Sequence, residues 1–206
     1  MPLDIEPPQP PPRRWDDLPG RLVVISGASG SGKSTIVDRL LSPPRADRQR
    51  SISMTTRPIR PGEVDGVNYL FVDRPRFEAD REAGAFLEWA EVHGQLYGTP
   101  ARRVEESLRR GTSIFLVIDV QGGMNVREQV PNALLVFIHA PDPATLEARL
   151  RARGTDPEDS IRLRLENARR EVALSDRYDA QIINDDLDHA VAQLAAILDP
   201  HPQPGG

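Results

Sequence analysis

The chain alternates between short, continuous apolar runs and longer segments in which apolar residues recur every three or four positions. Continuous runs are typical of strands covered on both faces of a parallel sheet, and the longer spacing is typical of amphipathic helices. Their alternation predicts an α/β fold, a parallel sheet core with helices on both faces and ligands at the carboxyl ends of its strands. The predicted strands are 22–25, 50–53, 113–119, 134–139 and 180–184, and the predicted helices are 33–41, 101–110, 123–129, 144–153, 158–174 and 187–198.

A glycine-rich segment joins the first predicted strand to the first predicted helix. Residues 27–34 read Gly-Ala-Ser-Gly-Ser-Gly-Lys-Ser, a complete G-x-x-x-x-G-K-[ST] phosphate-binding loop in the context that this motif requires. Its backbone N–H groups and the helix N-terminus favour a nucleotide polyphosphate. We expect Lys33 to reach the β- and γ-phosphates and the Ser34 hydroxyl to be a ligand of Mg²⁺. The ATP-binding residues expected in this segment are Gly27, Ala28, Ser29, Gly30, Ser31, Gly32, Lys33, Ser34 and Thr35.

The segment 55–99 interrupts the alternation of strands and helices. It contains shorter apolar pieces at 67–72 and 86–92, several glycines, and a high density of hydroxyl groups, arginines and tyrosines. We interpret it as a mixed-strand insertion that faces the phosphate-binding loop across a cleft.

The insertion carries residues suited to a nucleoside monophosphate. Arg57 and Arg60, three positions apart, and the pair Tyr69 and Tyr97 can bind the oxygens of a phosphate monoester. Glu88 can accept hydrogen bonds from the N1–H and amino groups of guanine, whereas adenine would oppose it with a lone pair. Taken singly, each residue also fits a surface ion pair, a solvated strand or half-buried packing. Together with the loop, the set favours guanine as the acceptor base.

The succession T-T-R-x-x-R-x-G-E, Y-x-F, F-x-E-W-A and Y-G-T in the insertion, together with the loop, resembles the guanylate kinase family over about residues 21–199. The resemblance implies a P-loop NTPase-type core with a GMP-binding insertion and a helical lid. It also implies transfer of the γ-phosphoryl group of ATP to GMP in purine nucleotide metabolism. By resemblance, the base is held by Ser53, Glu88, Thr99 and Asp119, and its 5′-phosphate by the two arginines and two tyrosines above. Gly98 is the remaining residue expected to bind GMP.

A basic segment resembles the lid of the same family. Seven arginines lie in the segment 145–170, and a solvated pair of basic helices would explain most of them. The turn R-x-R-G-T-D, however, resembles the family's lid, which implies that Arg149, Arg153 and Arg164 close over the ATP phosphates. Asn184 matches the adenine-side loop of the family.

One position departs from the family pattern. The strand before Asp119 usually carries a second acidic residue two positions earlier, and this chain has Val117 there. An acidic group would help to order the water shell of the metal, so its replacement bears on the Mg²⁺ geometry or the turnover rate.

The composition of the chain limits the kinds of molecule that it is expected to bind. The 206 residues suffice for one α/β domain, and the net charge of −5 gives no sign of affinity for nucleic acid or anionic membranes. The absence of cysteine excludes disulfides and thiolate metal sites, and the Pro-rich start has no apolar run that would make a secretory signal or a membrane span. We expect a cytoplasmic enzyme, monomer or homodimer, that uses ATP, GMP and Mg²⁺, with the use of dGMP left open.

The expected organisation is a single domain between two tails. The core of this domain is divided by the insertion and the lid region. The boundaries are 1–20 for a Pro-rich disordered tail, 21–199 for the domain (core 21–54, 100–144 and 176–199, insertion 55–99, lid region 145–175) and 200–206 for the C-terminal tail.

Two other functions share parts of this pattern. Catalytically inactive domains that look like guanylate kinase bind peptides, and a related P-loop kinase would act on a sugar bisphosphate. The intact phosphate-binding loop argues against the first, and the presence of Glu88 and the tyrosine pair argues against the second.

Overall fold

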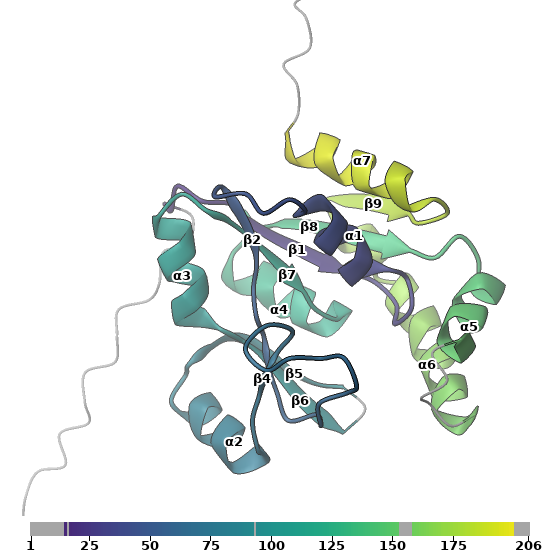
Figure 1. Ribbon diagram of the computed structural model, residues 1–206, viewed down its shortest axis with the longest axis horizontal. Coiled ribbons are helices and arrows are strands. Elements are labelled where there is room, and N and C mark those ends of the chain that lie inside the picture. Colours follow the sequence, from purple (N-terminus) through teal and green to yellow (C-terminus); the bar gives the residue numbers. More distant parts are fainter. Residues whose placement is uncertain (1–14, 16, 93, 153–157, 200–206) are drawn as a thin grey trace, which may run out of the picture.

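The computed structural model describes residue 15 and residues 17–92, 94–152 and 158–199. These residues form two sheets and the helices that pack on them (Figure 1). Five parallel strands form the main sheet, in the order β2-β7-β1-β8-β9. Its strands are β1 (Leu22–Ser26), β2 (Arg48–Arg50), β7 (Ser113–Val117), β8 (Leu134–His139) and β9 (Ala180–Ile183).

The central strand β1 shows how the main sheet is buried on both faces. Leu22 and Val24 belong to the apolar cluster under α3 and α4 on one face. Val23 and Ile25 belong to the cluster under α1 and α7 on the other. This burial explains why the strand reads as a continuous apolar run, and the predicted α/β fold is confirmed. The helices are α1 (Lys33–Leu40), α3 (Ala101–Arg109), α4 (Val120–Gln129) and α7 (Leu187–Leu198).

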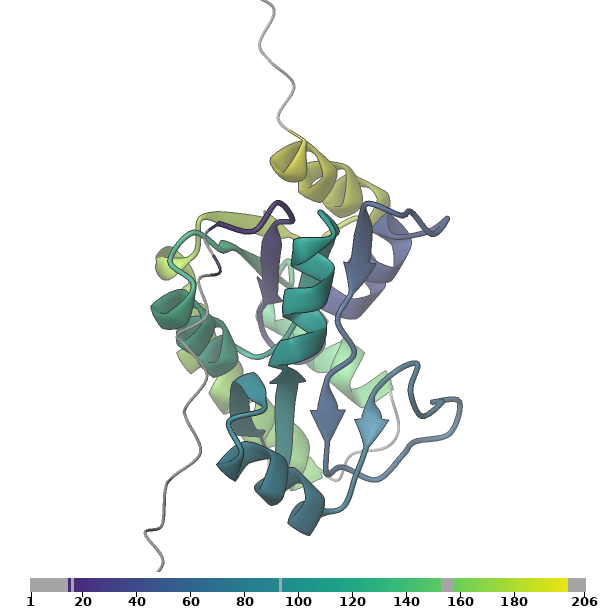
Figure 2. The same ribbon diagram turned by 90° about the vertical axis from the view of Figure 1, so that its left-hand side faces the viewer.

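The segment between β2 and α3 forms a second sheet, in the order β4-β3-β6-β5. Strand β3 pairs parallel with β4 and antiparallel with β6, which pairs antiparallel with β5. Phe77 of α2 is fully buried and stacks on Phe86, with ring centres 4.6 Å apart. Figure 2 shows this sheet and α2 at the end of the structure opposite α7. The elements are β3 (Met54–Thr55), β4 (Leu70–Phe71), α2 (Arg74–Glu82), β5 (Phe86–Val92) and β6 (Gln95–Pro100).

A helix pair packs beside the carboxyl ends of the main sheet. Apolar residues of α5 (Pro143–Ala152) and α6 (Glu158–Val172) form a small cluster that includes Ala28 of the phosphate-binding loop. A short 3₁₀ helix, Ser175–Arg177, follows α6 and leads into β9. Within the described ranges, no helix is long and apolar enough to cross a lipid bilayer.

The second core strand differs from its prediction. It spans Arg48–Arg50 rather than 50–53, and it is an edge strand of the main sheet. Its arginine side chains form ion pairs with Asp199 and Asp38 instead of entering the core. A charged edge strand has no apolar run, so hydropathy alone misplaces it.

Asp119 accounts for a second difference. Its side chain accepts a hydrogen bond from the N–H of Gly122 at 2.7 Å, which makes it the N-cap of α4. Strand β7 therefore ends at Val117 instead of continuing to residue 119, and α4 begins at Val120 instead of Gly123.

Helix α2 has no counterpart among the predicted elements. Asp73 caps it by accepting a hydrogen bond from the N–H of Arg76 at 2.9 Å, and Pro75 lies in its first turn. An Asp followed closely by Pro is a helix-start signal that would have found it. Only Phe77 of this helix is buried, so the helix shows no apolar stripe.

The remaining predicted elements agree with the structure within two residues, except the piece 67–72, of which only Leu70–Phe71 is a strand. Both chain ends beyond residues 15 and 199, residue 16, and Arg153 with the lid turn after it lie outside the described residues.

Candidate active site

The phosphate-binding loop, residues 27–34, connects β1 to α1. Gly27, Gly30 and Gly32 have φ angles of 141°, 93° and 96°. Residues that carry a Cβ rarely adopt such values. A Cβ on Gly27 would also collide with the carbonyl oxygen of Ile138. These glycines therefore allow a backbone path that leads directly to the N-terminus of α1, where an anion is stabilised.

Lys33 begins α1 and reaches back over this loop. Its Nζ donates to the carbonyl oxygens of Gly27 and Ala28 at 2.6 and 2.9 Å. In the same loop the Ser31 hydroxyl is buried, without a hydrogen-bond partner among the described residues. An ammonium group and an unpartnered hydroxyl in one loop suit a ligand with several anionic oxygens.

Two arginines of the helix pair contact this region. Arg164 of α6 donates to Ser29 Oγ at 3.0 Å, and Arg149 of α5 donates to the backbone oxygen of Asn184 at 3.1 Å. The buried Asn184 amide in turn donates to the carbonyl of Ser31 at 2.7 Å. The structure thus brings these three predicted donor-side residues to the loop.

The start of α1 fits a nucleotide-bound Mg²⁺ ion. Ser34 and Thr35 are exposed in its first turn. Such an ion keeps mostly water and phosphate oxygens as ligands, so one protein hydroxyl suits it. Within the described ranges, no group of three or more His, Cys, Asp or Glu residues is placed to hold a metal by itself. Val117 packs in the apolar cluster under α1 and α7.

On the second sheet, the predicted phosphate ligands gather around Arg57. Its guanidinium lies 5.5 Å from the ring centre of Tyr69, and the rings of Tyr69 and Tyr97 meet edge to face, 6.0 Å apart. Arg60 is exposed, and its backbone N–H donates to the carboxylate of Glu63 at 2.8 Å. The structure therefore brings one of the two arginines and both tyrosines into one cluster.

Glu63 holds this cluster together and was not among the predicted site residues. Its carboxylate accepts two hydrogen bonds from Arg57, at 2.7 and 3.0 Å. Burial raises the pKa of Glu63, but the bonds from Arg57 and from the Arg60 backbone lower it below its usual value overall. A bidentate pair fixes the plane of the guanidinium. The signal was present, because Glu63 is the last residue of T-T-R-x-x-R-x-G-E.

Glu88 is a buried carboxyl group on β5, only 5% exposed. Its Oε1 accepts a hydrogen bond from Thr99 Oγ1 at 2.5 Å. Burial raises the pKa of Glu88 to about 7; the negative charge of Asp119 adds to the rise, and the hydrogen bond from Thr99 opposes it. A buried carboxylate of this kind is stabilised by a ligand that supplies N–H donors.

Asp119 connects Glu88 to the phosphate-binding loop. A Cβ on Gly122 would lie 2.7 Å from Glu88 Oε2 and 3.2 Å from Asp119 Oδ1, so the two carboxyl groups flank this glycine. The backbone oxygen of Asp119 accepts from Ser26 Oγ at 3.1 Å, at the residue that precedes the loop. Ser53 is buried immediately before β3. The residues predicted to bind the base therefore begin beside the loop and continue onto the second sheet.

Gly98 is explained by packing. It lies in β6, where a Cβ would come within 3.0 Å of the rings of Phe77 and Phe86. The glycine lets this strand lie against α2, which supports the strand that carries Tyr97 and Thr99.

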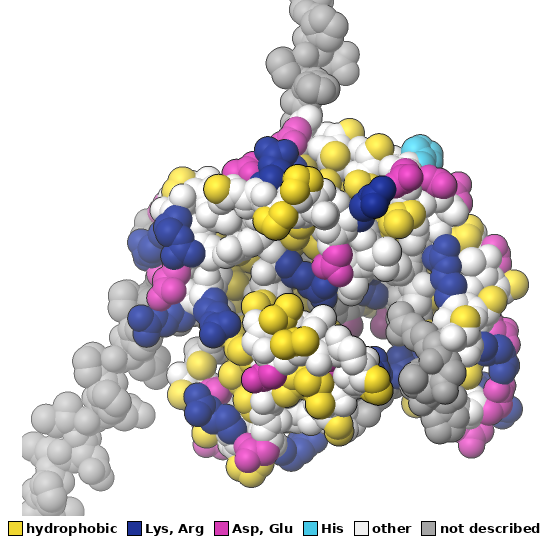
Figure 3. Space-filling view, in the orientation of Figure 1, with side chains coloured by type: hydrophobic (Ala, Val, Ile, Leu, Met, Phe, Trp, Pro, Cys, Tyr) yellow, Lys and Arg dark blue, Asp and Glu magenta, His cyan; other side chains and the backbone are white. Residues whose placement is uncertain are grey.

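The main sheet and the second sheet face each other across a hollow. Figure 3 shows Lys and Arg side chains in it, with an acidic side chain at its rim, between α1 above and the second sheet below. Cations gathered in a hollow attract a polyanionic ligand.

Comparisons with known proteins place this arrangement in a family. The family model for guanylate kinase matches residues 19–201. A guanylate kinase of Thermus thermophilus is 49% identical over 179 residues, 87% of this chain and 80% of that protein. One from Rubrobacter xylanophilus is 45% identical over 181 residues, 87% of this chain and 93% of that protein. The crystal structure of guanylate kinase from Anaplasma phagocytophilum superposes with a TM-score of 0.71 at 31% identity and covers 90% of this chain and 87% of that chain. The chain therefore belongs to the guanylate kinase family of nucleoside monophosphate kinases, as its motifs indicated.

Proposed function

We propose that the chain transfers the γ-phosphoryl group of ATP to GMP, giving ADP and GDP. The observation that carries this proposal is the buried carboxyl group of Glu88, beside Asp119 and close to the start of the phosphate-binding loop. Guanine offers two adjacent N–H donors to a carboxylate, whereas adenine presents an acceptor there. A buried group left unpaired discriminates strongly between ligands, so this carboxylate favours guanine.

The donor half is built on the phosphate-binding loop. We assign the ATP phosphates to residues 27–34 and the adenine to the surroundings of Asn184. Lys33 would exchange its bonds with loop carbonyls for bonds with phosphate oxygens. Arg149 and Arg164 would add positive charge from the helix pair, since both already contact this region.

Ser34 is the residue that we assign to Mg²⁺, together with the phosphates of the nucleotide. When bound, the ion supplies positive charge that offsets the charge on the transferred group. We assign Arg153 a place beside the ATP phosphates on the motif alone.

The acceptor half is built on the second sheet. We assign the phosphate of GMP to Arg57, Tyr69 and Tyr97, which already form one cluster, with Arg60 approaching it when the nucleotide is bound. The remaining residues would hold the base: Ser53, Glu88, Thr99 and Asp119.

The transfer step needs no dedicated general base. The second phosphate pKa of a nucleoside monophosphate is about 6, so near neutral pH an anionic oxygen is available to attack the γ-phosphorus. Catalysis then depends on alignment of the two nucleotides and on positive charge around the transferred group. Exclusion of water from the hollow prevents simple hydrolysis of ATP.

The direct test compares acceptors. ADP formation from ATP is measured with GMP, AMP, CMP or UMP under identical conditions, and we expect a specificity constant for GMP that is higher by about a thousandfold or more. Equal rates with AMP would contradict the role of Glu88 as the base-reading residue.

A second prediction concerns the hydrogen bonds that orient the Arg57 side chain. Glu63→Gln removes the carboxylate that accepts both bonds from Arg57, so the guanidinium loses its fixed plane. We expect the KM for GMP to rise about tenfold, with a smaller change in kcat. Steady-state kinetics with varied GMP measures this rise.

A matched control for Glu63→Gln is Asp80→Asn. It breaks another Arg–carboxylate pair of the same region, Arg76–Asp80 on α2, which lies on the helix surface. Its KM for GMP should stay at the wild-type value. An equal rise in both variants would assign the effect to general loosening of the second sheet.

The setting of the reaction is part of the proposal. We place the enzyme in the purine nucleotide metabolism of the cytoplasm, with ATP and GMP as partners. Neither a peptide-binding role nor phosphorylation of a sugar bisphosphate is favoured by any feature of the described residues or by the relatives reported above.

A further inference from the structure

Arg50 ends the edge strand β2 at the carboxyl side of the main sheet. It is in register with Phe115 of β7, whose side chain lies in the cluster under α1 and α7. Residues paired across neighbouring strands point to the same face of a sheet. The Arg50 side chain therefore lies on the α1 face, at the end of the sheet that carries the phosphate-binding loop.

Two residues of α1 hold the Arg50 guanidinium. Its Nη1 donates to Asp38 Oδ1 at 2.8 Å, and its Nη2 lies 3.5 Å from Ser34 Oγ. Ser34 and Asp38 are four positions apart, so they lie on the same face of the helix. The guanidinium is thereby held next to the hydroxyl that we assign to the metal and the donor phosphates.

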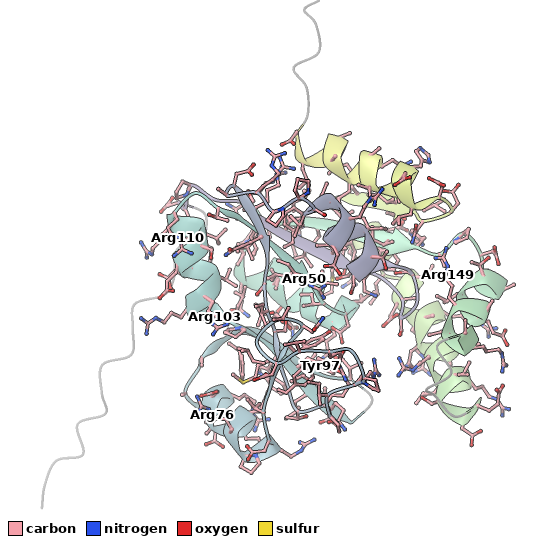
Figure 4. All side chains as sticks on the ribbon, viewed as in Figure 1. Arg50, Arg76, Tyr97, Arg103, Arg110 and Arg149 are labelled. Atoms are coloured by element: carbon pink, nitrogen blue, oxygen red, sulfur yellow. The ribbon has the colours of Figure 1, made fainter. Side chains whose placement is uncertain are left out.

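The same guanidinium also acts on the acceptor half. Burial raises the pKa of Tyr69 and Tyr97 adds to the rise, while the positive charge of Arg50, like that of Arg57, acts in the opposite direction. Figure 4 shows Arg50 between α1 and the second sheet, above Tyr97. Arg50 therefore lies between the loop that would bind the donor phosphates and the cluster that would bind the acceptor phosphate.

Arg50 has hydrogen-bonding capacity left for a ligand. A guanidinium carries five N–H donors, and the described contacts of Arg50 with Asp38 and Ser34 leave donors for anionic oxygens. Its side chain is 25% exposed and Asp38 is 60% exposed, so solvent reaches the pair, which is not sealed in the core. Val117, at the end of the neighbouring strand, adds no charge there.

We propose that Arg50 is a phosphate-binding residue at the junction of the two nucleotides, where it contacts oxygens of both the donor's terminal phosphate and the acceptor's phosphate. Asp38 is its positioning residue, because it fixes the guanidinium against α1. This inference rests on the proposed transfer from ATP to GMP. It adds a cation from the core sheet to those of the loop, the lid and the insertion.

The test compares Arg50→Gln with Arg48→Gln. Arg48 is a matched control because it lies on the same strand and the same face and also pairs with a carboxylate, Asp199, but it lies at the other end of β2. Thermal unfolding is measured for both variants to check that each is folded. We expect kcat/KM to fall about ten- to a hundredfold for Arg50→Gln only.

A binding measurement separates the junction role from a role at one nucleotide. Calorimetry is carried out with ADP, with GMP, and with adenosine and guanosine linked through a pentaphosphate chain. Arg50→Gln should weaken the linked probe clearly more than it weakens ADP or GMP alone. Equal affinities of the wild type and Arg50→Gln for the linked probe would overturn the inference. A loss for GMP alone as large as for the linked probe would likewise overturn it.

Asp38→Asn completes a double-mutant cycle. If Asp38 acts through Arg50, the double variant with Arg50→Gln is no less active than Arg50→Gln alone, and an additive further loss would overturn the positioning role. The two levels of the proposal fail separately. A wild-type chain that cannot phosphorylate GMP overturns the proposed function, whereas an active wild type with an Arg50→Gln variant of equal kcat/KM overturns only this inference.

Discussion

Lys33→Ala should lower kcat by about a thousandfold or more while the protein stays folded. The ammonium group lies within hydrogen-bond distance of two loop carbonyls, in the position where it can pass to the phosphates of ATP. Its loss removes positive charge from the transferred group at the stage when negative charge is spread over its oxygens. Rates of ADP formation at saturating ATP and GMP measure the change, and circular dichroism with thermal unfolding checks the fold.

Arg39→Gln is the control for Lys33→Ala. Arg39 also belongs to α1, but its side chain is 62% exposed and pairs with Asp188 on the surface. This variant loses the same charge from the same helix and should keep the wild-type rate. If Lys33→Ala also kept most of the wild-type rate, Lys33 would have no catalytic role.

Glu88→Gln is expected to lower kcat/KM for GMP by about a thousandfold and to leave the KM for ATP nearly unchanged. The amide can still accept the hydrogen bond from Thr99, but it cannot accept from both N–H groups of guanine as a carboxylate does. Steady-state kinetics with each substrate varied in turn separates the two effects. An unchanged specificity constant for GMP would count against base reading by this residue.

The pH dependence provides a second readout of the same substitution. With a pKa of about 7, Glu88 is protonated in a growing fraction of the free enzyme as the pH falls below that value. Because the proposed contact with guanine requires the carboxylate form, the KM for GMP should rise as the pH falls from about 8 to about 6, by up to about tenfold per pH unit. The phosphate pKa of GMP, about 6, affects the wild type and the variant alike. The part of the rise due to Glu88 should disappear in Glu88→Gln.

Stability gives the control for this variant. The pKa of Glu88 is higher in the folded protein than its ordinary value of 4.5, so the folded state binds more protons between these two values. The contribution of Glu88 to the free energy of unfolding therefore decreases as the pH rises towards 7. At about pH 8 the wild-type protein holds a buried negative charge at Glu88, and Glu88→Gln replaces it with a neutral side chain. The unfolding temperature of Glu88→Gln should therefore not be below that of the wild type.

Much of the core was predictable because its strands are buried on both faces. A run such as 134–139 is apolar up to its last residue, His139, so most of its extent can be read directly from hydropathy, and the structure has the same bounds. The phosphate-binding loop was predictable for another reason. Its glycines are required by the backbone path, as the collision of a Cβ on Gly27 with Ile138 shows, and such requirements leave a fixed spacing in the sequence.

The features that sequence reasoning missed depend on contacts between distant segments. Strand β2 is charged, and its place in the sheet depends on β7 and on ion pairs with α1 and with Asp199. Likewise, nothing in the local pattern separates Arg50 from a solvated arginine until Ser34 and Asp38 are seen beside it. Tertiary ion pairs leave no periodicity in a single sequence, so they become visible only in three dimensions.

Asn184 has a consequence for how the donor nucleotide binds. Its amide group joins the end of β9 to the phosphate-binding loop through the carbonyl of Ser31, and a Cβ on Gly32 would overlap the same amide nitrogen. This cross-link fixes the backbone before any ligand arrives, so association loses little conformational entropy at this site. The loop at Ser31 and Gly32 is therefore already in place when a donor nucleotide binds, so this part of the site adds no ordering cost to the difference between the affinities of ATP and ADP.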